Sequence, residues 1–342
     1  MKMALKEMKK NKSRYLIVGS IVLLISLVTF IISGLANGLS QDNVSLIKNM
    51  PDGTFYMSED ANESFTQSHI DASKQNQILN NDREAFAFSI QMGSLKNEAD
   101  NQQSVAFLTS TDAPLLKQVN EGEVILDSGL KAEGIQVGDE LSSPLFEGTF
   151  KVIDFVDNKT FNHSPVALIS QETFEEMFRT DEWQLLYLPD TTETISGLQS
   201  FSKKEFLSTI PSYQAEQMTL NMIVWFLVVI SGMLFAIFFY MMNVQKIGMY
   251  GILKALGIRT SDLFKMMWSQ MAMITIIALL ISTAISQVFQ YVAPDSMPYH
   301  LTLTTTLQLS LVFAVVGFIG STLSGFQIKK IDPLQAIQQG EA

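Results

Sequence analysis

The sequence predicts a membrane protein with four transmembrane α-helices in a one-plus-three arrangement and an α+β domain between the first and second helices. Three observations support this fold class. Four long apolar runs occur in 342 residues, one near the start and three near the end. A long, acidic and soluble-looking segment separates the first run from the second. Basic residues concentrate in the short segments before the first run, between the second and third runs, and after the fourth run.

Each apolar run contains an uncharged stretch long enough to cross a bilayer. The runs are Tyr15–Leu39, Leu220–Asn243, Met267–Phe289 and Leu303–Phe326. About 20 residues of helix span about 30 Å of hydrocarbon. Backbone polar groups inside a bilayer need partners within their own segment, so we expect α-helices. Buried helices of a soluble core rarely lack charge over such lengths, and here the pattern occurs four times.

Charge predicts the orientation of the chain. The segments before the first run, between the second and third, and after the fourth hold 12 basic and 4 acidic residues. The insert 40–218 holds 11 basic and 29 acidic residues, a net charge of −18. Because basic residues favour the cytoplasmic side, both termini are expected in the cytoplasm and the insert outside. The basic rim suits anionic membrane lipid, and the total charge of −11 argues against a nucleic-acid partner.

These patterns divide the chain of a multi-pass cell-membrane protein into nine segments. The expected segments are a cytoplasmic N-terminus (1–14), the first transmembrane helix (15–39), the extracellular domain (40–218), the second helix (219–243), a cytoplasmic elbow (244–266), the third helix (267–289), an outer loop (290–302), the fourth helix (303–326) and a cytoplasmic tail (327–342). The first run is expected to remain as an anchor, because it is longer than a usual signal core and no clear cleavage site follows it. The absence of cysteine excludes disulfides and thiolate-bound metal ions.

The outer insert has two parts with different patterns. Residues 40–105 are polar and weakly periodic, although Gln41–Asn49 is expected to extend the first helix. From Glu123 onward, short apolar or alternating segments predict strands around Val124–Leu126, Gly138–Leu141, Phe150–Phe155 and Val166–Ile169. Ser170 is expected to cap a helix that carries Phe174, Met177 and Phe178 at helical spacing. The sequence therefore predicts an α+β domain with a small, mostly antiparallel sheet.

The cytoplasmic elbow contains a short amphipathic helix. A helix through this segment would present Ile252, Leu253 and Leu256 on one side, and Gly257 is expected to end it. Such a helix suits docking into a groove on another protein. A helical connector resting on the inner leaflet explains the periodicity equally well.

Several motifs in the sequence resemble those of a known family. Gly251–Thr260 looks like the coupling segment of ABC permeases of the FtsX/MacB-like superfamily, and Lys330–Ile337 is similar to their C-terminal Pro-x-x-Ala-Ile/Leu signature. Val124–Leu130 with Gly138 and Asp139 resembles the MacB-like extracellular domain of the family. The one-plus-three layout agrees. The resemblance implies a permease subunit whose coupling residues Ile252, Leu253, Leu256 and Gly257 contact a separate cytoplasmic ATPase.

A narrower resemblance concerns the outer ends of the first two runs. Ile32–Leu39 and Tyr213–Met222 look like the haem-export permeases of Gram-positive bacteria. That resemblance implies a homodimer working with two copies of the ATPase, with haem as the substrate rather than as a permanently bound cofactor.

The chemistry of the residues agrees with a non-enzymatic subunit. The chain has no Gly-x-x-x-x-Gly-Lys-Ser/Thr loop, so energy must come from a partner or from an ion gradient, or none is used. No Ser/His/Asp or Cys/His constellation stands out, and imidazole comes only from His69, His163 and His300. No catalytic residue is therefore predicted, and no metal site apart from the iron of bound haem.

The candidate haem- or substrate-binding residues lie where the second run meets the outer surface. They are Tyr213, Glu216, Met218 and Met222. Haem needs an apolar slot and one or two axial donors, and Met218 and Met222 share a helix face. At the edge of hydrocarbon a carboxylate such as Glu216 needs a metal ion, an arginine or a proton. The alternative is an interfacial glutamate that reaches water beside an aromatic-belt tyrosine.

Gly34 and Gly38 permit close helix packing and suit a dimer seam, although the motif is common by chance. Two other functions remain open. One is an ABC permease for an antimicrobial peptide, lipid or lipoprotein. The other is a mechanotransmitting subunit that couples ATP use to an external enzyme and transports nothing.

Overall fold

The structure of this chain is a computed structural model that describes residues 7–79, 84–112, 116–189, 193–294 and 297–330. The chain forms two compact units. The membrane unit comprises residues 1–38 and 218–342, and the outer unit comprises residues 39–217. The C-terminal signature Lys330–Ile337 and the tail that carries it lie outside the described residues, apart from Lys330.

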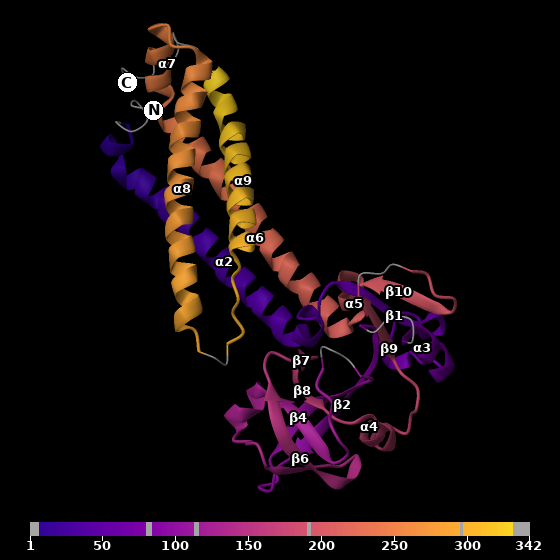
Figure 1. The fold of residues 1–342 in the computed structure, drawn as a ribbon. Helices are drawn as coiled ribbons and strands as arrows, with labels where there is room; N and C mark the ends of the chain where they lie inside the picture. Colours follow the sequence, from indigo (N-terminus) through magenta and orange to yellow (C-terminus); the bar gives the residue numbers. More distant parts are fainter. Residues whose placement is uncertain (1–6, 80–83, 113–115, 190–192, 295–296, 331–342) are drawn as a thin grey trace. The chain divides into compact units, whose positions relative to one another are not determined.

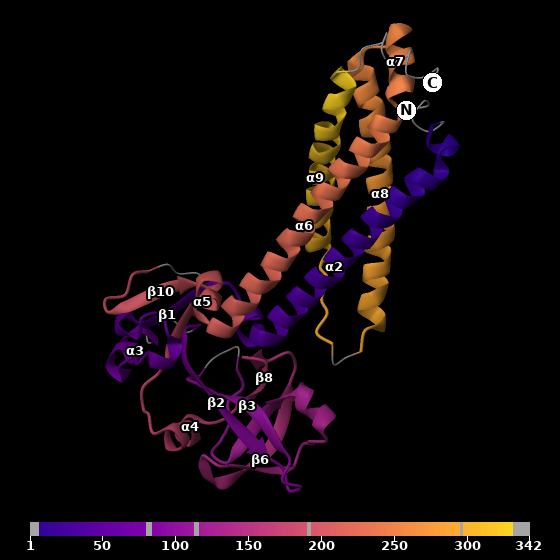
Figure 2. The same ribbon diagram turned by 180° about the vertical axis from the view of Figure 1, so that it is seen from behind.

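Long helices build the membrane unit (Figures 1 and 2). They are α2 (Lys12–Lys48), α6 (Pro211–Gln245), α8 (Thr260–Val292) and α9 (Leu303–Lys330), with the short α7 (Ile247–Ala255) between α6 and α8. Within the described ranges, four helices are long and apolar enough to cross a membrane. The prediction of four transmembrane helices in a one-plus-three arrangement is confirmed.

The first helix continues beyond its apolar run, as expected. It extends to Lys48, and Val44 interrupts it with φ −141° and ψ 34°. Residues 39–48 of α2 and 211–217 of α6 belong to the outer unit. Both helices therefore supply polar side chains to that unit.

The core of the membrane unit is centred on the first half of α8. Met267, Met271 and Ile274 of this helix pack against Phe235 and Phe239 of α6. Many apolar side chains on the other faces of α6, α8 and α9 remain exposed within the chain. Exposed apolar faces are what helices in contact with lipid require.

A ten-stranded sheet forms the outer unit. Its strands are β1 (Gly53–Ser58), β2 (Phe86–Lys96), β3 (Gln102–Ser110), β4 (Glu123–Asp127), β5 (Glu140–Ser143), β6 (Phe146–Val156), β7 (Thr160–Phe161), β8 (Ser164–Leu168), β9 (Leu185–Pro189) and β10 (Leu198–Ser202). The order is β10-β1-β9-β2-β3-β8-β4-β6-β5, with β7 on β8. A bridge between Lys96 and Ser142 joins β2 to β5 and closes one part of the sheet into a ring.

Both faces of the sheet are buried, which explains the short apolar strands. Val124 and Leu126 of β4 point into a core inside the ring, whereas Ile125 between them points into a second core. The neighbouring strand β8 alternates in the same way, with Val166 and Leu168 opposite to Ala167. The predicted strands around these residues are confirmed, because side chains alternate between faces along a strand.

The size of the sheet differs from the prediction. The polar segment 40–105 supplies β1, β2 and part of β3, and β2 pairs with β3 from Phe88↔Ser110 to Lys96↔Gln102. Every residue of β2 from Phe86 to Ile90 is buried, but beyond Ile90 only Leu95 is, so the full length of this strand has little apolar periodicity. The sheet is mostly antiparallel, as expected, but β3–β8 and β4–β6 are parallel pairs. The expectation of a small sheet was wrong.

Short helices close the outer unit and lead into α6. They are α3 (Ala72–Leu79), α4 (Gln171–Phe178) and α5 (Lys203–Thr209). Ser170 caps α4 through its hydroxyl, as predicted. Ser202 and Glu205 form a capping box on α5, and Pro211 begins α6, where its missing N–H costs nothing. Phe206 and Ile210 are buried in the core, so the first turns of α6 are anchored to the outer unit.

Candidate functional site

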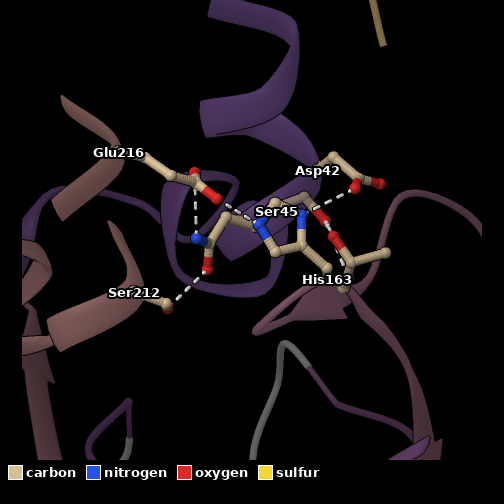
Figure 3. Close-up of polar contacts among 7 residues, drawn as sticks. Asp42, Ser45, His163, Ser212 and Glu216 are labelled. Atoms are coloured by element: carbon tan, nitrogen blue, oxygen red, sulfur yellow. Dashed lines mark hydrogen bonds and ion pairs between the residues drawn. The ribbon is translucent and has the colours of Figure 1, made fainter. Parts of the chain in front are cut away.

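One imidazole lies between two carboxylates in the outer unit (Figure 3). Nε2 of His163 lies 2.5 Å from Oε1 of Glu216, and Nδ1 lies 2.9 Å from Oδ2 of Asp42. Glu216 comes from α6, Asp42 from α2 and His163 from the turn between β7 and β8. The histidine thus joins two helices and the sheet.

A buried amide completes the contact between the helices. Asn43, which is fully buried, donates from Nδ2 to Oε2 of Glu216 at 3.1 Å. The hydroxyl of Ser212 donates to Oδ1 of the same asparagine at 3.3 Å. Both oxygens of Glu216 therefore have partners within the outer unit.

The turn that carries His163 has an uncommon backbone. Asn162 and His163 form the two-residue connection between β7 and β8, with φ of 51° and 58°. Two-residue hairpin turns favour positive φ at both central residues, and glycine is the usual second residue. The side chain of Ser45 holds the turn against α2, since its Oγ accepts the N–H of Thr160 at 2.7 Å. The backbone thus directs the imidazole towards the helices at some conformational cost.

The charge of His163 follows from its neighbours. Burial lowers its pKa, but the hydrogen bonds to Asp42 and Glu216 and the charges of both carboxylates outweigh burial and raise the pKa above 6.5. A protonated imidazole donates from both nitrogens, which matches an acceptor on each side. The two acceptors and the raised pKa therefore favour a carboxylate–imidazolium–carboxylate chain.

This chain of hydrogen bonds is not a chelating site. The two carboxylates contact opposite ring nitrogens, so they face one another across the imidazole. Across the described ranges, no three His, Asp or Glu side chains are grouped as metal ligands. The sequence suggested a metal ion, an arginine or a proton as the partner of Glu216, and the structure supplies His163 instead.

The four predicted haem-binding side chains do not converge. Tyr213 is partly buried against the outer core, with Nζ of Lys48 5.5 Å from its ring centroid. Met218 and Met222 are 68% and 53% exposed and belong to the membrane unit. At about 100° per residue, these methionines lie on the opposite side of α6 from Tyr213 and Glu216. Helix geometry therefore separates the four residues into two pairs.

Sequence reasoning missed Asp42, Asn43 and the role of His163. No spacing along the chain relates residues 42, 163 and 216, because β-sheet topology brings them together. The one available signal was that His163 follows Asn162 in a polar dipeptide between two apolar segments, which is a turn pattern.

The residues that the sequence predicts to couple to an ATPase lie on and after α7. Ile252 and Leu256 are 52% and 75% exposed, and Met249 shares their face at the spacing i, i+3, i+7. Leu253 instead packs against the core of the membrane unit. The predicted face of Ile252, Leu253 and Leu256 is therefore corrected to Met249, Ile252 and Leu256.

The end of α7 agrees with the prediction for Gly257. This glycine has φ of 86°, and its N–H donates to the carbonyl of Lys254 at 3.0 Å. The N–H of Ile258 donates to the carbonyl of Leu253 at 3.0 Å. These two bonds define a Schellman motif, in which glycine supplies the left-handed residue. Leu253 and Ile258 both pack against the core, which fixes how α7 leaves the membrane unit.

Gly34 and Gly38 already have a partner within the chain. A Cβ added at Gly34 would overlap the ring of Tyr299, and one at Gly38 would overlap the carbonyl of Pro298. The N–H of His300 donates to the carbonyl of Gly34 at 2.9 Å. The close approach that these glycines permit is therefore intramolecular. The expected dimer seam has no support from this arrangement.

The C-terminal part of the chain matches a known family. Residues 221–333 match the FtsX-like permease C-terminal family. The chain contains an FtsX-like permease domain. This domain includes most of α6 and all of α7, α8 and α9, so the exposed face of Met249, Ile252 and Leu256 lies inside it, whereas Tyr213 and Glu216 precede it.

Curated relatives match this chain along its whole length. A protein of Staphylococcus haemolyticus named "Putative hemin transport system permease protein HrtB" is 28% identical over 98% of this chain and 99% of its own length. A protein of Staphylococcus epidermidis with the same name is 29% identical over the full length of both chains. The similarity thus covers the outer unit as well as the permease domain.

Solved structures resemble the outer unit weakly. The periplasmic region of MacB from Actinobacillus actinomycetemcomitans has a TM-score of 0.34 and 11% identity, covering 46% of this chain and 91% of that one. The extracellular domain of the noncanonic ABC-type transporter YknZ from Gram-positive bacteria has a TM-score of 0.32 and 11% identity, covering 44% and 98%. The description of the outer unit therefore rests on its own strand pairing.

Proposed function

We propose that this chain is the permease subunit of an ABC efflux transporter that exports haem from the membrane. The observation that carries the proposal is the full-length similarity to permeases named for hemin transport, which extends through both units. An FtsX-like permease domain with four apolar helices supports the coarser part, a transporter subunit in a membrane.

Energy is supplied by a separate, HrtA-like ABC ATPase in the cytoplasm. The apolar face of Met249, Ile252 and Leu256 is the docking surface, since an exposed apolar stripe on a short helix fits a groove on a partner. We expect two ATPase copies and a homodimer of this chain. ATP binding moves α7, and α6 passes this movement outward, because a single junction residue separates the two helices.

Haem contacts α6 near its entry into the membrane unit. Met218 and Met222 offer two thioether sulfurs four residues apart on an exposed helix face, and thioether is a known haem-iron ligand. Tyr213 and Glu216 lie on the other side of the helix. Glu216 reaches haem only if its contact with His163 opens, so we assign the first contact to the methionines.

The direct test is a haem titration of the purified chain in detergent, followed by absorbance. The wild type is expected to bind haem, and Met218→Leu/Met222→Leu is expected to weaken binding more than Glu216→Ala. Leu preserves the apolar volume and removes the sulfur, so it isolates ligation. A flat titration in the wild type would sink the haem proposal.

A growth test separates the alternative substrates. A strain lacking this gene is challenged with haem and, in parallel, with an antimicrobial peptide. Sensitivity to haem alone supports the proposal. Unchanged haem sensitivity with new peptide sensitivity would assign the chain to peptide export instead.

A further inference from the structure

A buried ion pair occupies the junction between α6 and α7. Lys246 precedes α7, and its side chain is only 7% exposed. Its ammonium forms an ion pair with Glu7, whose side chain is 11% exposed. The same ammonium donates to the hydroxyl of Tyr15 at 2.8 Å. None of these residues belongs to the docking face or to the haem contacts proposed above.

Among the described residues, hydrogen bonds in this part of the membrane unit involve side chains from α2, α6, α7, α8 and α9. Nε2 of Gln270, from α8, donates to Oε2 of Glu7 at 2.7 Å. The hydroxyl of Tyr250, from α7, donates to Oδ1 of Asn243 at 3.3 Å, and Nδ2 of Asn243 donates to Oγ of Ser324, from α9, at 3.3 Å. Burial, followed by the charge of Glu7, raises the pKa of Tyr250. Its hydroxyl therefore stays a donor.

Apolar side chains surround this polar layer. Phe239, Met242, Leu263 and Met267 are buried in the same core. Burying two charges there carries a large desolvation cost, and apolar residues of similar volume often stabilise a fold as well or better. An ion pair instead fixes the relative position of two segments, because each buried charge is favourable only beside its partner. The pair therefore specifies where the start of α7 sits against the N-terminal helical turn at residues 7–10.

We infer that Glu7 and Lys246 are positioning residues that lock the coupling helix α7 to the transmembrane helices, so that movement of α7 is passed on rather than absorbed at the junction. This inference rests on the proposed function of α7 as the ATPase docking element. Without the pair, α7 keeps its apolar face and still docks. The junction between α6 and α7 becomes flexible, so ATP hydrolysis no longer moves the transmembrane helices.

The test compares a neutral and a charge-swapped pair. The neutral variant is Glu7→Gln/Lys246→Met, and the swapped variant is Glu7→Lys/Lys246→Glu. Single changes leave one charge buried without its partner and are expected to destabilise the fold, so the double variants carry the comparison. Leu145→Ser, at an exposed position of the outer unit, is the control.

The first readout is independent of substrate. The chain has no cysteine, so spin labels at Leu16→Cys on α2 and Ala255→Cys on α7 report a single distance. Both positions are exposed. The distance distribution is expected to be narrow in the wild type, broader in the neutral variant and narrow again in the charge-swapped variant. A neutral variant with the wild-type distribution would overturn the inference.

The second readout uses the complex with its co-purifying ATPase in vesicles loaded with haem. The neutral variant is expected to retain the ATPase and to hydrolyse ATP, while haem export per ATP falls about tenfold, within the usual range of coupling between sites. A merely structural role would lower complex yield and leave that ratio unchanged. If the wild type exports no haem, the proposed function fails, while the spin-label distances still decide the inference.

If the neutral variant does not fold, Glu7→Lys and the charge-swapped variant replace it. The inference is supported if Glu7→Lys broadens the distance distribution and adding Lys246→Glu narrows it again, because the second change restores only the opposite charges of the pair. Equal broadening in both would refute it.

Discussion

Nε2 of His163 lies 2.5 Å from Oε1 of Glu216, although 53 residues separate them in the chain. The contact fastens the β7–β8 turn to the start of α6, and Asp42 holds the other ring nitrogen from α2. Glu216 therefore ties the helix that leads to the coupling element into the outer unit. Protons control this tie, because only a protonated imidazole can donate to both carboxylates.

The stability of the chain is expected to fall as pH rises. The pKa of His163 is raised above its unfolded value of 6.5. A raised pKa contributes stability that is fully present below the unfolded pKa and is lost as pH rises through the folded pKa. Thermal unfolding in detergent between about pH 6 and about pH 9 should therefore show a decline that His163→Gln removes. A decline of equal size in that variant would contradict the assignment. His163→Gly, which suits the positive φ, controls for the turn.

Replacing Asn43 is expected to destabilise the outer unit. Asn43→Ala leaves Glu216 and Ser212 without the buried amide that pairs with both, at a cost of about 1–3 kcal/mol. Denaturant titration of the full chain measures the loss. Asn101→Ala, at an exposed loop position, should change stability by less than about 0.5 kcal/mol. Equal effects at both positions would show that Asn43 is not a structural link.

Docking of the ATPase is expected to depend on Leu256 rather than Leu253. Leu256→Asp changes an exposed side chain, so the chain should fold normally and fail to co-purify with its ATPase. Leu253→Asp buries a charge in the membrane core and should instead lower yield and melting temperature. Leu145→Asp, an exposed leucine of the outer unit, should affect neither. Retained co-purification of Leu256→Asp would exclude docking through this face.

The glycines of α2 are expected to differ sharply in their tolerance of alanine. Gly38→Ala places a methyl group against the carbonyl of Pro298, whereas the same change at Gly19 places it 3.7 Å from Cγ2 of Ile274. Gly19→Ala should be neutral or stabilising by up to about 1 kcal/mol, since alanine favours helix. Gly38→Ala should lower the melting temperature without changing the oligomeric state. If Gly38→Ala abolished dimer formation and left the melting temperature unchanged, the result would instead support the dimer seam expected from the sequence.

The transmembrane helices were predictable from the sequence because the bilayer imposes a simple condition. A segment of about 20 uncharged residues must satisfy its own backbone, whatever its neighbours are. The strand around Val124–Leu126 was predictable for a similar reason, since both of its faces are apolar. Ser170 and Gly257 were readable because capping depends on residues within one turn.

The hairpin of β2 and β3 was not predictable by the same means. Much of it is polar, and its pairing depends on partners elsewhere in the sheet. The orientation of Leu253 also escaped the sequence, because Ile252, Leu253 and Leu256 are all apolar and only packing decides which one is buried. Gly34 and Gly38 indicated close packing correctly but could not name the partner.

By itself, the sequence determined the four apolar helices, the Ser170 cap of α4, the end of α7 at Gly257 and the family of its C-terminal part. Each follows from local composition or from spacing within one element. Only the tertiary structure decided that His163 lies between Asp42 and Glu216 and that Lys246 pairs with Glu7 across the membrane unit. Such contacts join segments of opposite charge that lie far apart in the chain. Many acidic and basic residues compete for each partner until the sheet topology and helix packing select one.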